Sequence, residues 1–92
     1  MNTIQAHFQQ NIFAECVGKF ENTRNKGFAG EDYDTYEEET LADCQQLCVE
    51  EHPMCHAVDF KNGICRLFGE YSGKKLIENV GNVHSVMKPC DR

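Results

Sequence analysis

The residues of this chain best suited to chemistry are its cysteines, which can form disulfides or ligate a metal ion. The six cysteines of the 92-residue chain are Cys16, Cys44, Cys48, Cys55, Cys65 and Cys90. An even number of cysteines in so short a chain is typical of a disulfide framework, here of three bridges. Because such frameworks persist in oxidising compartments, we expect an extracellular, secreted protein. This composition favours a loop-rich binding module over an enzyme.

Zinc binding is the competing interpretation of the same residues. The ligands would come from Cys44, Cys48, Cys55, His56 and Cys65, which supply enough thiolate and imidazole groups for a tetrahedral site. Zinc ligands usually form tight C-x2-C pairs, whereas Cys44 and Cys48 have helical spacing. Zinc would also leave Cys16 and Cys90 unexplained. We therefore expect no metal and no other cofactor, and keep an intracellular zinc protein as a disfavoured alternative.

Acidic residues are concentrated in the segment Glu31–Glu39. The net charge is −6, and this segment holds six of the 15 acidic residues and no basic one. The rest of the chain, with nine acidic and nine basic residues, is neutral. An anionic surface repels phosphate backbones and anionic lipid headgroups, which argues against nucleic acid and membranes as partners. The simplest interpretation of this acidic segment is a solvated surface loop. The functional interpretation is an anionic patch that attracts a basic partner.

The residues that we expect to face a ligand lie in this segment and in a later loop, Tyr71–Gly81. They are Glu31, Asp32, Tyr33, Asp34, Tyr36, Glu37, Lys74 and Lys75. Tyr33 and Tyr36 have acidic neighbours, which suggests the hypothesis that they are sulfated. The two lysines are more simply explained as solvated side chains. A calcium site is not indicated, because the acidic segment lacks the alternating Asp/Asn and Gly order of a calcium loop.

Catalytic groups are poorly represented. The histidines, His7, His52, His56 and His84, are scattered, and no serine lies in a nucleophile-elbow sequence. Cys55 beside His56 suggests a nucleophilic pair, but a cysteine in a disulfide is no nucleophile. The stretch His52–Met54, just before Cys55, is the one candidate for the rigid loop of a protease inhibitor. We therefore expect a non-enzymatic protein.

One helix and several strands must position these residues. The clearest signal is a helix over Leu41–Glu51, with Thr40 as N-cap, Asp43 completing an approximate capping box, and Pro53 beyond its end. The predicted strands are Phe13–Phe20, Cys55–Phe60, Ile64–Phe68 and His84–Lys88. The predicted surface loops are Glu21–Glu39 and Gly69–Gly81.

The turn between the two central strands decides which cysteines share a face. Cys44 and Cys48 lie on one face of the predicted helix, so we expect their partners to share a face of the hairpin. A two-residue turn at Asn62-Gly63 would place Cys55 and Cys65 on opposite faces, because a shift of one residue turns a strand over.

We therefore predict a three-residue loop, Lys61–Gly63, with Gly63 in a left-handed conformation and Phe60 paired with Ile64. The residues that would then face the helix are Cys55, Ala57, Asp59, Cys65 and Leu67. The opposite face, with His56, Val58, Phe60, Ile64 and Phe68, would be too apolar for solvent, so we expect the hairpin to be central in the sheet.

This layout favours one disulfide pairing without proving it. The shorter connection favours Cys48–Cys55 and leaves Cys44–Cys65, while Cys16–Cys90 would join the terminal strands. Six cysteines allow many other connectivities, and spacing alone does not exclude them.

The order of these residues resembles the PAN/apple domain family, and its six-cysteine apple variant in particular. The resemblance is carried by Cys16, Tyr36, Thr40-Leu41, Cys44, Cys48, Cys55–Phe60, Gly63–Leu67 and Cys90, and covers residues 13–90. It implies an α+β fold, a small disulfide-rich twisted antiparallel sheet of about five strands cradling one α-helix. It also implies first-to-sixth, second-to-fifth and third-to-fourth disulfides, which agrees with the pairing favoured by the layout.

The resemblance further implies an extracellular, non-catalytic recognition or adhesion module that binds a protein or carbohydrate through surface loops. The alternative is a small secreted effector, either a protease inhibitor or an anti-adhesive protein that blocks a receptor. We divide the chain into an N-terminal extension (1–12), the module (13–90) and a C-terminal tail (91–92). Because Met1–Asn11 lacks the basic start and apolar stretch of a signal peptide, we expect a mature form or one module of a larger protein.

Overall fold

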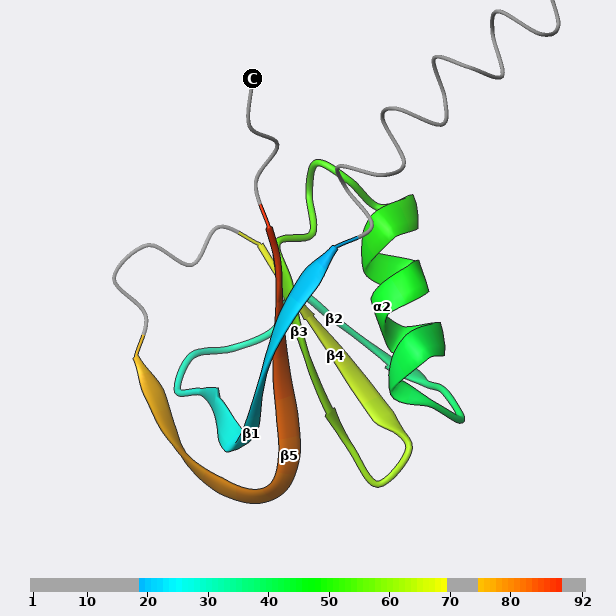
Figure 1. The fold of residues 1–92 in the computed structure, drawn as a ribbon. Helices are drawn as coiled ribbons and strands as arrows, with labels where there is room; N and C mark the ends of the chain where they lie inside the picture. The colour runs from blue at the N-terminus through cyan, green and yellow to red at the C-terminus, as the bar shows by residue number, and fades with distance from the viewer. Residues whose placement is uncertain (1–18, 70–74, 89–92) are drawn as a thin grey trace, which may run out of the picture.

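The computed structural model describes residues 19–69 and 75–88, which form a five-stranded antiparallel sheet and one helix (Figure 1). In chain order the elements are β1 (Phe20–Phe28), β2 (Asp34–Glu37), α2 (Leu41–Glu50), β3 (Ala57–Lys61), β4 (Ile64–Phe68) and β5 (Leu76–Met87). The strand order across the sheet is β1-β5-β3-β4-β2, so the β3–β4 hairpin is central. The predicted α+β architecture is confirmed. No helix in this described part of the chain is long and apolar enough to cross a membrane.

The helix forms where its local signals predict it. The Thr40 hydroxyl accepts a hydrogen bond of 3.1 Å from the Asp43 backbone N–H, which satisfies one of the unpaired donors at the start of a helix. At the other end, the Glu51 N–H donates to Leu47 O at 3.1 Å, and Pro53 follows. α2 lies along one face of the sheet (Figure 1).

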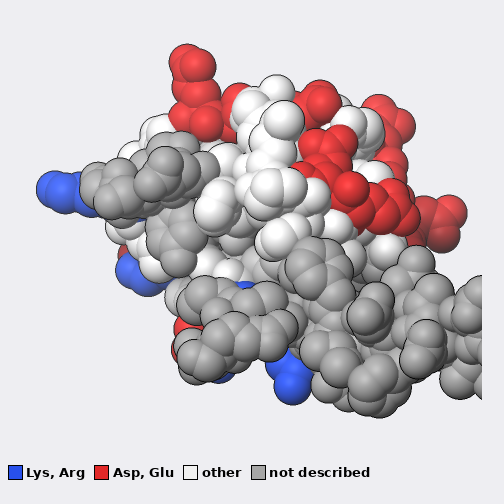
Figure 2. All heavy atoms as spheres, turned by 90° about the horizontal axis from the view of Figure 1, so that it is seen from above, with Lys and Arg blue, Asp and Glu red and all other residues white. Residues whose placement is uncertain are grey.

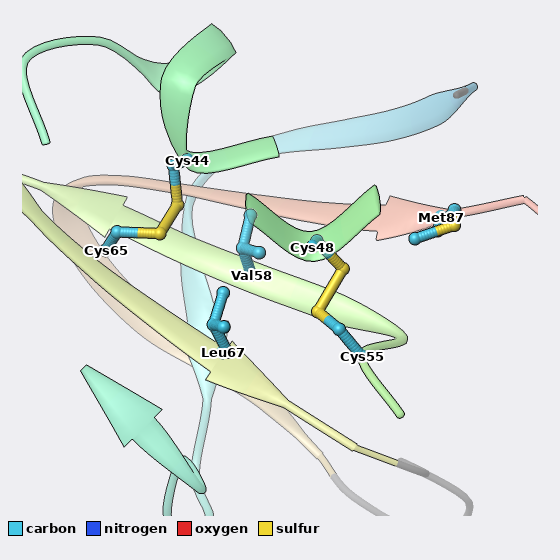
Figure 3. Close-up of a cluster of buried hydrophobic side chains, with 7 residues drawn as sticks. All are labelled: Cys44, Cys48, Cys55, Val58, Cys65, Leu67 and Met87. Carbon is cyan, nitrogen blue, oxygen red and sulfur yellow. A yellow bond between two sulfur atoms is a disulfide. The ribbon is translucent and has the colours of Figure 1, made fainter. Parts of the chain in front are cut away.

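Two disulfides fix this helix to the sheet. Cys44 is bonded to Cys65 in β4, and Cys48 is bonded to Cys55 just before β3. Val58 and Leu67 lie between the two bridges (Figure 3), and both side chains are fully buried. Burying a Val or Leu side chain stabilises a fold by about 1.5–3 kcal/mol. Because a domain this small has few such side chains, its core alone gives little net stability, and the covalent bridges add to it. The third predicted pair, Cys16 and Cys90, lies outside the described residues.

The predicted three-residue loop of the central hairpin is wrong. Phe60 pairs with Cys65 and Lys61 with Ile64, so the turn has two residues, Asn62 and Gly63. Both turn residues have positive φ, 51° and 79°, the conformation of the type I′ turn that Asn-Gly favours.

Cys55 explains why the prediction failed. It lies before β3 begins, and its N–H donates to Glu51 O at the end of the helix. Strand alternation therefore does not decide where its side chain points, and both disulfides are compatible with the two-residue turn. The predicted faces change accordingly: Val58 lies in the core beneath α2, whereas Ala57 and Phe68 lie in a second apolar cluster.

This second cluster covers the sheet face opposite the helix. Its buried residues are Phe28, Ala57 and Phe68, with Val86 packed against them. The Phe28 and Phe68 rings meet edge to face, with centroids 5.1 Å apart. Asp59, which we expected to face the helix, lies on this second face, where Oδ2 accepts a hydrogen bond of 3.0 Å from the Phe28 N–H.

Strands β1 and β5 extend into segments that we predicted to be loops. The predicted loop Glu21–Glu39 contains most of β1 and all of β2, and the predicted loop Gly69–Gly81 contains the first half of β5. The predicted first strand, Phe13–Phe20, lies outside the described residues except for its end. The long β1–β5 pairing is interrupted between Arg24 and Lys26, where β5 curves (Figure 1) and the Gly81 N–H donates to Asn25 Oδ1. The last residues of β1 and the first residues of β5, which pair with each other, thereby fold over the second face.

Candidate functional site

The acidic segment forms one edge of the sheet and the connection to the helix. β2 lies within it and pairs only with β4, so its other edge is unpaired within the described sheet. The exposed candidates here are Glu31, Tyr33, Asp34 and Glu37, whereas Asp32 and Tyr36 are half-buried. Figure 2 shows that most of the acidic side chains visible in this view gather along its upper side, whereas the basic ones lie at the left and below. The segment is therefore an ordered, charged surface.

Asp32 is tied to the central sheet by an ion pair with Arg66 of β4. Asp32 Oδ1 lies 3.1 Å from both Nε and Nη2 of Arg66. Partial burial raises the pKa of Asp32, but hydrogen bonds from Thr35 and its own backbone, together with Arg66, outweigh this effect and hold the pKa below its usual value. Asp32 is thus a structural anchor of the segment.

The two candidate tyrosines use their hydroxyl groups within the molecule. Tyr33 Oη donates to Glu51 Oε1 at 2.8 Å, and Tyr36 Oη donates to Asp34 Oδ2 at 2.8 Å. Burial and the Glu51 carboxylate raise the pKa of Tyr33. The hydrogen bond to Asp34 raises the pKa of Tyr36. A sulfate on either tyrosine would remove the O–H donor of one of these bonds, and sulfation stays a hypothesis.

An open depression lies where β2 leads into α2. It has a volume of about 660 Å³ and is lined by Glu37, Glu38, Glu39, Asp43, Asn62, Gly63 and Ile64. Asn62 and Gly63, the turn of the central hairpin, form part of its lining, and the Glu38 N–H donates a hydrogen bond of 3.0 Å to Gly63 O. We call this feature the acidic depression. Its four carboxylates suit the ammonium or guanidinium groups of a basic ligand.

Sequence reasoning found only part of this depression. Glu37 was a candidate, and its two glutamate neighbours belong to the acidic segment. Asp43 was assigned only a capping role, and the hairpin turn only a structural one. No local signal could have placed them together, because the depression depends on the pairing of β2 with β4.

Of the two lysine candidates, only Lys75 lies in the described part of the chain, and it is not in the acidic depression. Lys75 is exposed, precedes β5, and accepts a hydrogen bond of 3.0 Å on its backbone oxygen from the Ala29 N–H. It is not among the residues that line the acidic depression. Lys74 lies outside the described residues.

The histidines and cysteines form no accessible reactive site in the described ranges. His84 contacts Asp59, but both side chains are buried and neither can reach a substrate. His52 and His56 are exposed, and His7 lies outside the described residues. Cys55 is in a disulfide, which removes it as a nucleophile. Over residues 19–69 and 75–88, no three potential ligands are placed to hold a metal ion.

The zinc alternative is contradicted by the disulfides. The four cysteines that it needs, Cys44, Cys48, Cys55 and Cys65, are bonded to one another in pairs. None of them can offer a thiolate, which is the form of cysteine that binds zinc.

The candidate inhibitor loop has a compact conformation. His52, Pro53 and Met54 are exposed, but the Met54 N–H donates to Glu51 O at 2.7 Å. The loop is therefore a turn that continues the end of α2, unlike the extended segment that a protease cleft accepts.

Comparisons with known proteins agree with this architecture. A PAN module from Eimeria tenella, solved in solution, superposes with a TM-score of 0.54 and 22% sequence identity, covering 83% of this chain and 85% of that one. At this identity the similarity supports the fold alone. No curated protein gives a significant match. The sequence profile of the PAN domain matches residues 16–90, which span all six cysteines and every described strand and the helix. The chain therefore belongs to the PAN domain family.

Proposed function

We propose that this PAN domain is an extracellular, non-catalytic recognition module that binds a macromolecular ligand, and that the acidic depression binds a basic segment of a protein partner. PAN domains are in general interaction modules for proteins or carbohydrates. The disulfides support the oxidising compartment, since bridges of this kind do not persist in a reducing cytosol.

The observation that carries the proposal is the concentration of carboxylates around one depression. Glu37, Glu38, Glu39 and Asp43 line it, and no basic residue of ranges 19–69 and 75–88 does. The segment before it is held by the Asp32–Arg66 pair, so the carboxylates are displayed on a fixed backbone. A preordered surface loses less entropy on binding.

A salt-dependent binding experiment tests this proposal. The full chain would be passed over immobilised synthetic peptides that differ only in the replacement of lysine by glutamine. We expect binding to the lysine peptides, with an association rate that falls as sodium chloride increases, because salt screens long-range attraction. Binding that is equal for both peptide series would contradict the proposal.

A matched pair of variants locates the contact. Glu37→Gln/Glu39→Gln removes two charges from the acidic depression, whereas Glu21→Gln/Glu78→Gln removes two exposed charges from β1 and β5. We expect the first variant to lower the association rate about 3- to 10-fold and the second to change it less than about twofold. Equal effects of the two variants would show that only net charge matters.

A further inference from the structure

A second, smaller hollow lies on the sheet face opposite the helix. It has a volume of about 270 Å³ and is lined by Lys61, Asn62, Ile64, Arg66, Asn79 and Asn82. Lys61 and Arg66 belong to this face because they alternate with Phe60 and Cys65 along their strands. Among the residues that the structure describes, the lining contains two basic side chains, three amides and no carboxylate. Its chemistry is thus opposite to that of the acidic depression, although both share Asn62 and Ile64.

The polar side chains of this hollow are held in place by neighbours. Lys61 Nζ donates to Asn79 Oδ1 at 2.9 Å. Asn82 is 3% exposed, and its Nδ2 donates to Lys26 O at 2.5 Å. Arg66 is fixed by Asp32 and lies over the Phe68 ring, with Cζ 5.4 Å from its centroid. The hollow is therefore ordered before any ligand arrives.

These groups retain much of their hydrogen-bonding capacity. An asparagine amide can donate two hydrogen bonds and accept two, yet the side chains of Asn79 and Asn82 each make one within the described residues. An arginine offers five N–H donors, and Asp32 engages two nitrogens of Arg66. Lysine offers three donors, of which Lys61 uses one. Ile64 adds an apolar surface, with 38% of the residue exposed.

We propose that this hollow binds a single sugar ring that carries a carboxylate. Amides that both donate and accept match hydroxyl groups, which do the same, whereas a phosphate offers acceptors only. Lys61 and Arg66 match the carboxylate, and Ile64 matches the C–H face of the ring. The volume lies just below the range of about 300–1,000 Å³ for ligand pockets, so one ring fits rather than an oligosaccharide. The two hollows share Asn62 and Ile64 in their lining, but this proposal does not depend on the one made for the acidic depression.

A titration with three matched probes tests the chemistry. The isotope-labelled full chain would be titrated with methyl β-glucuronide, methyl β-glucoside and acetate, followed by backbone and Asn side-chain amide resonances. We expect saturable shifts at Asn62, Asn79 and Asn82 with the glucuronide only, and a Kd in the millimolar range for so small a ligand. Equal shifts with acetate would overturn the assignment to a sugar. Equal shifts with the neutral glucoside would overturn the role of the cations. No saturable shift with the glucuronide would overturn the site.

Variants of one lysine locate the binding. Lys61→Gln is expected to weaken glucuronide binding about 10-fold, since it removes a charge-assisted hydrogen bond. Lys61→Arg keeps the charge and is expected to retain binding within about threefold. Lys75→Gln removes an exposed charge outside the lining and serves as the control. The amide spectrum of each variant also reports whether its fold is intact. A folded Lys61→Gln variant that binds as the parent does would refute the proposal.

Discussion

Asp59 and His84 form a buried polar pair, with 2.7 Å between Asp59 Oδ1 and His84 Nδ1 and with residue exposures of 1% and 2%. The second carboxylate oxygen of Asp59 accepts a hydrogen bond from the Phe28 N–H, and the centroids of the Phe28 and His84 rings are 4.1 Å apart. The Asp59 carboxylate on β3 thus contacts both the His84 side chain on β5 and the backbone N–H of Phe28, the last residue of β1. This pair holds the curved ends of β1 and β5 against the second face of the sheet.

Replacing Asp59 should therefore strongly destabilise the fold. Asp59→Ala leaves the Phe28 N–H and the His84 ring without this acceptor in a buried site, which we expect to cost about 2–5 kcal/mol of unfolding free energy. Urea unfolding followed by circular dichroism measures this loss. Glu21→Ala, an exposed acidic residue on β1, is the control and should change stability by less than about 0.5 kcal/mol. Similar losses of unfolding free energy in both variants would show that the Asp59–His84 pair does not stabilise the fold.

The helix was predictable because its signals are local. Thr40 caps it, and Cys44 and Cys48 share its buried face, so a short window of sequence contains the information. β1 gave no such signal. Most of its side chains are exposed at an edge of the sheet, so its sequence lacks the alternation of a half-buried strand.

The features that the sequence does not predict are contacts between segments far apart in the chain. The hairpin register was predicted from the assumption that Cys55 lies in the strand, whereas its backbone is bonded to Glu51 at the end of α2. The acidic segment was visible in the sequence, but its pairing with Arg66, 34 residues beyond Asp32, was not. Both the depression and the anchor of the acidic segment arise from the β2–β4 pairing, for which the sequence has no local signature.

The two described disulfides should contribute unequally to stability. They close segments of 21 and 7 residues, and the chain-entropy account gives the longer loop the larger effect. We expect Cys44→Ser/Cys65→Ser to cost about 3 kcal/mol and Cys48→Ser/Cys55→Ser about 2 kcal/mol. Thermal unfolding of the two double variants under identical oxidising conditions makes the comparison.

The reverse order would show that loop length does not decide the contribution. It would favour instead a specific role for Cys48–Cys55 in joining the end of the helix to the start of β3. Each variant removes one bridge and leaves the other described bridge intact, so the comparison is matched.

Gly27 is required because other side chains occupy the space of a Cβ atom. A Cβ built at Gly27 would lie 2.9 Å from Asp59 Oδ2 and 3.1 Å from Asn79 Nδ2. Gly27→Ala should therefore cost about 1–3 kcal/mol, measured by urea unfolding. Gly69→Ala is a matched control, because its Cβ would meet nothing closer than 3.5 Å. An unchanged stability of Gly27→Ala would mean that the polar groups beside it can move apart at little cost.

The Asp32–Arg66 pair should give the domain part of its acid sensitivity. The pKa of Asp32 is held below the usual value of an aspartate carboxyl group. A carboxyl group whose pKa is lower in the folded state stabilises the fold above the unfolded-state pKa, and this stabilisation is lost as pH falls through the folded-state pKa. We therefore expect the unfolding free energy of the parent to decrease below about pH 4, and that of Asp32→Asn to decrease less. Urea unfolding across this pH range measures both slopes.

Arg66→Gln separates the contribution of the ion pair from that of the other hydrogen bonds. Thr35 and the Asp32 backbone still donate to the carboxylate in this variant, so part of the acid sensitivity should persist. The double variant Asp32→Asn/Arg66→Gln should have the same pH slope as Asp32→Asn alone, because the titrating carboxyl group is absent from both. An Asp32→Asn variant with the slope of the parent would show that other carboxyl groups carry the acid response, and that the edge segment is held by contacts independent of the Asp32 charge.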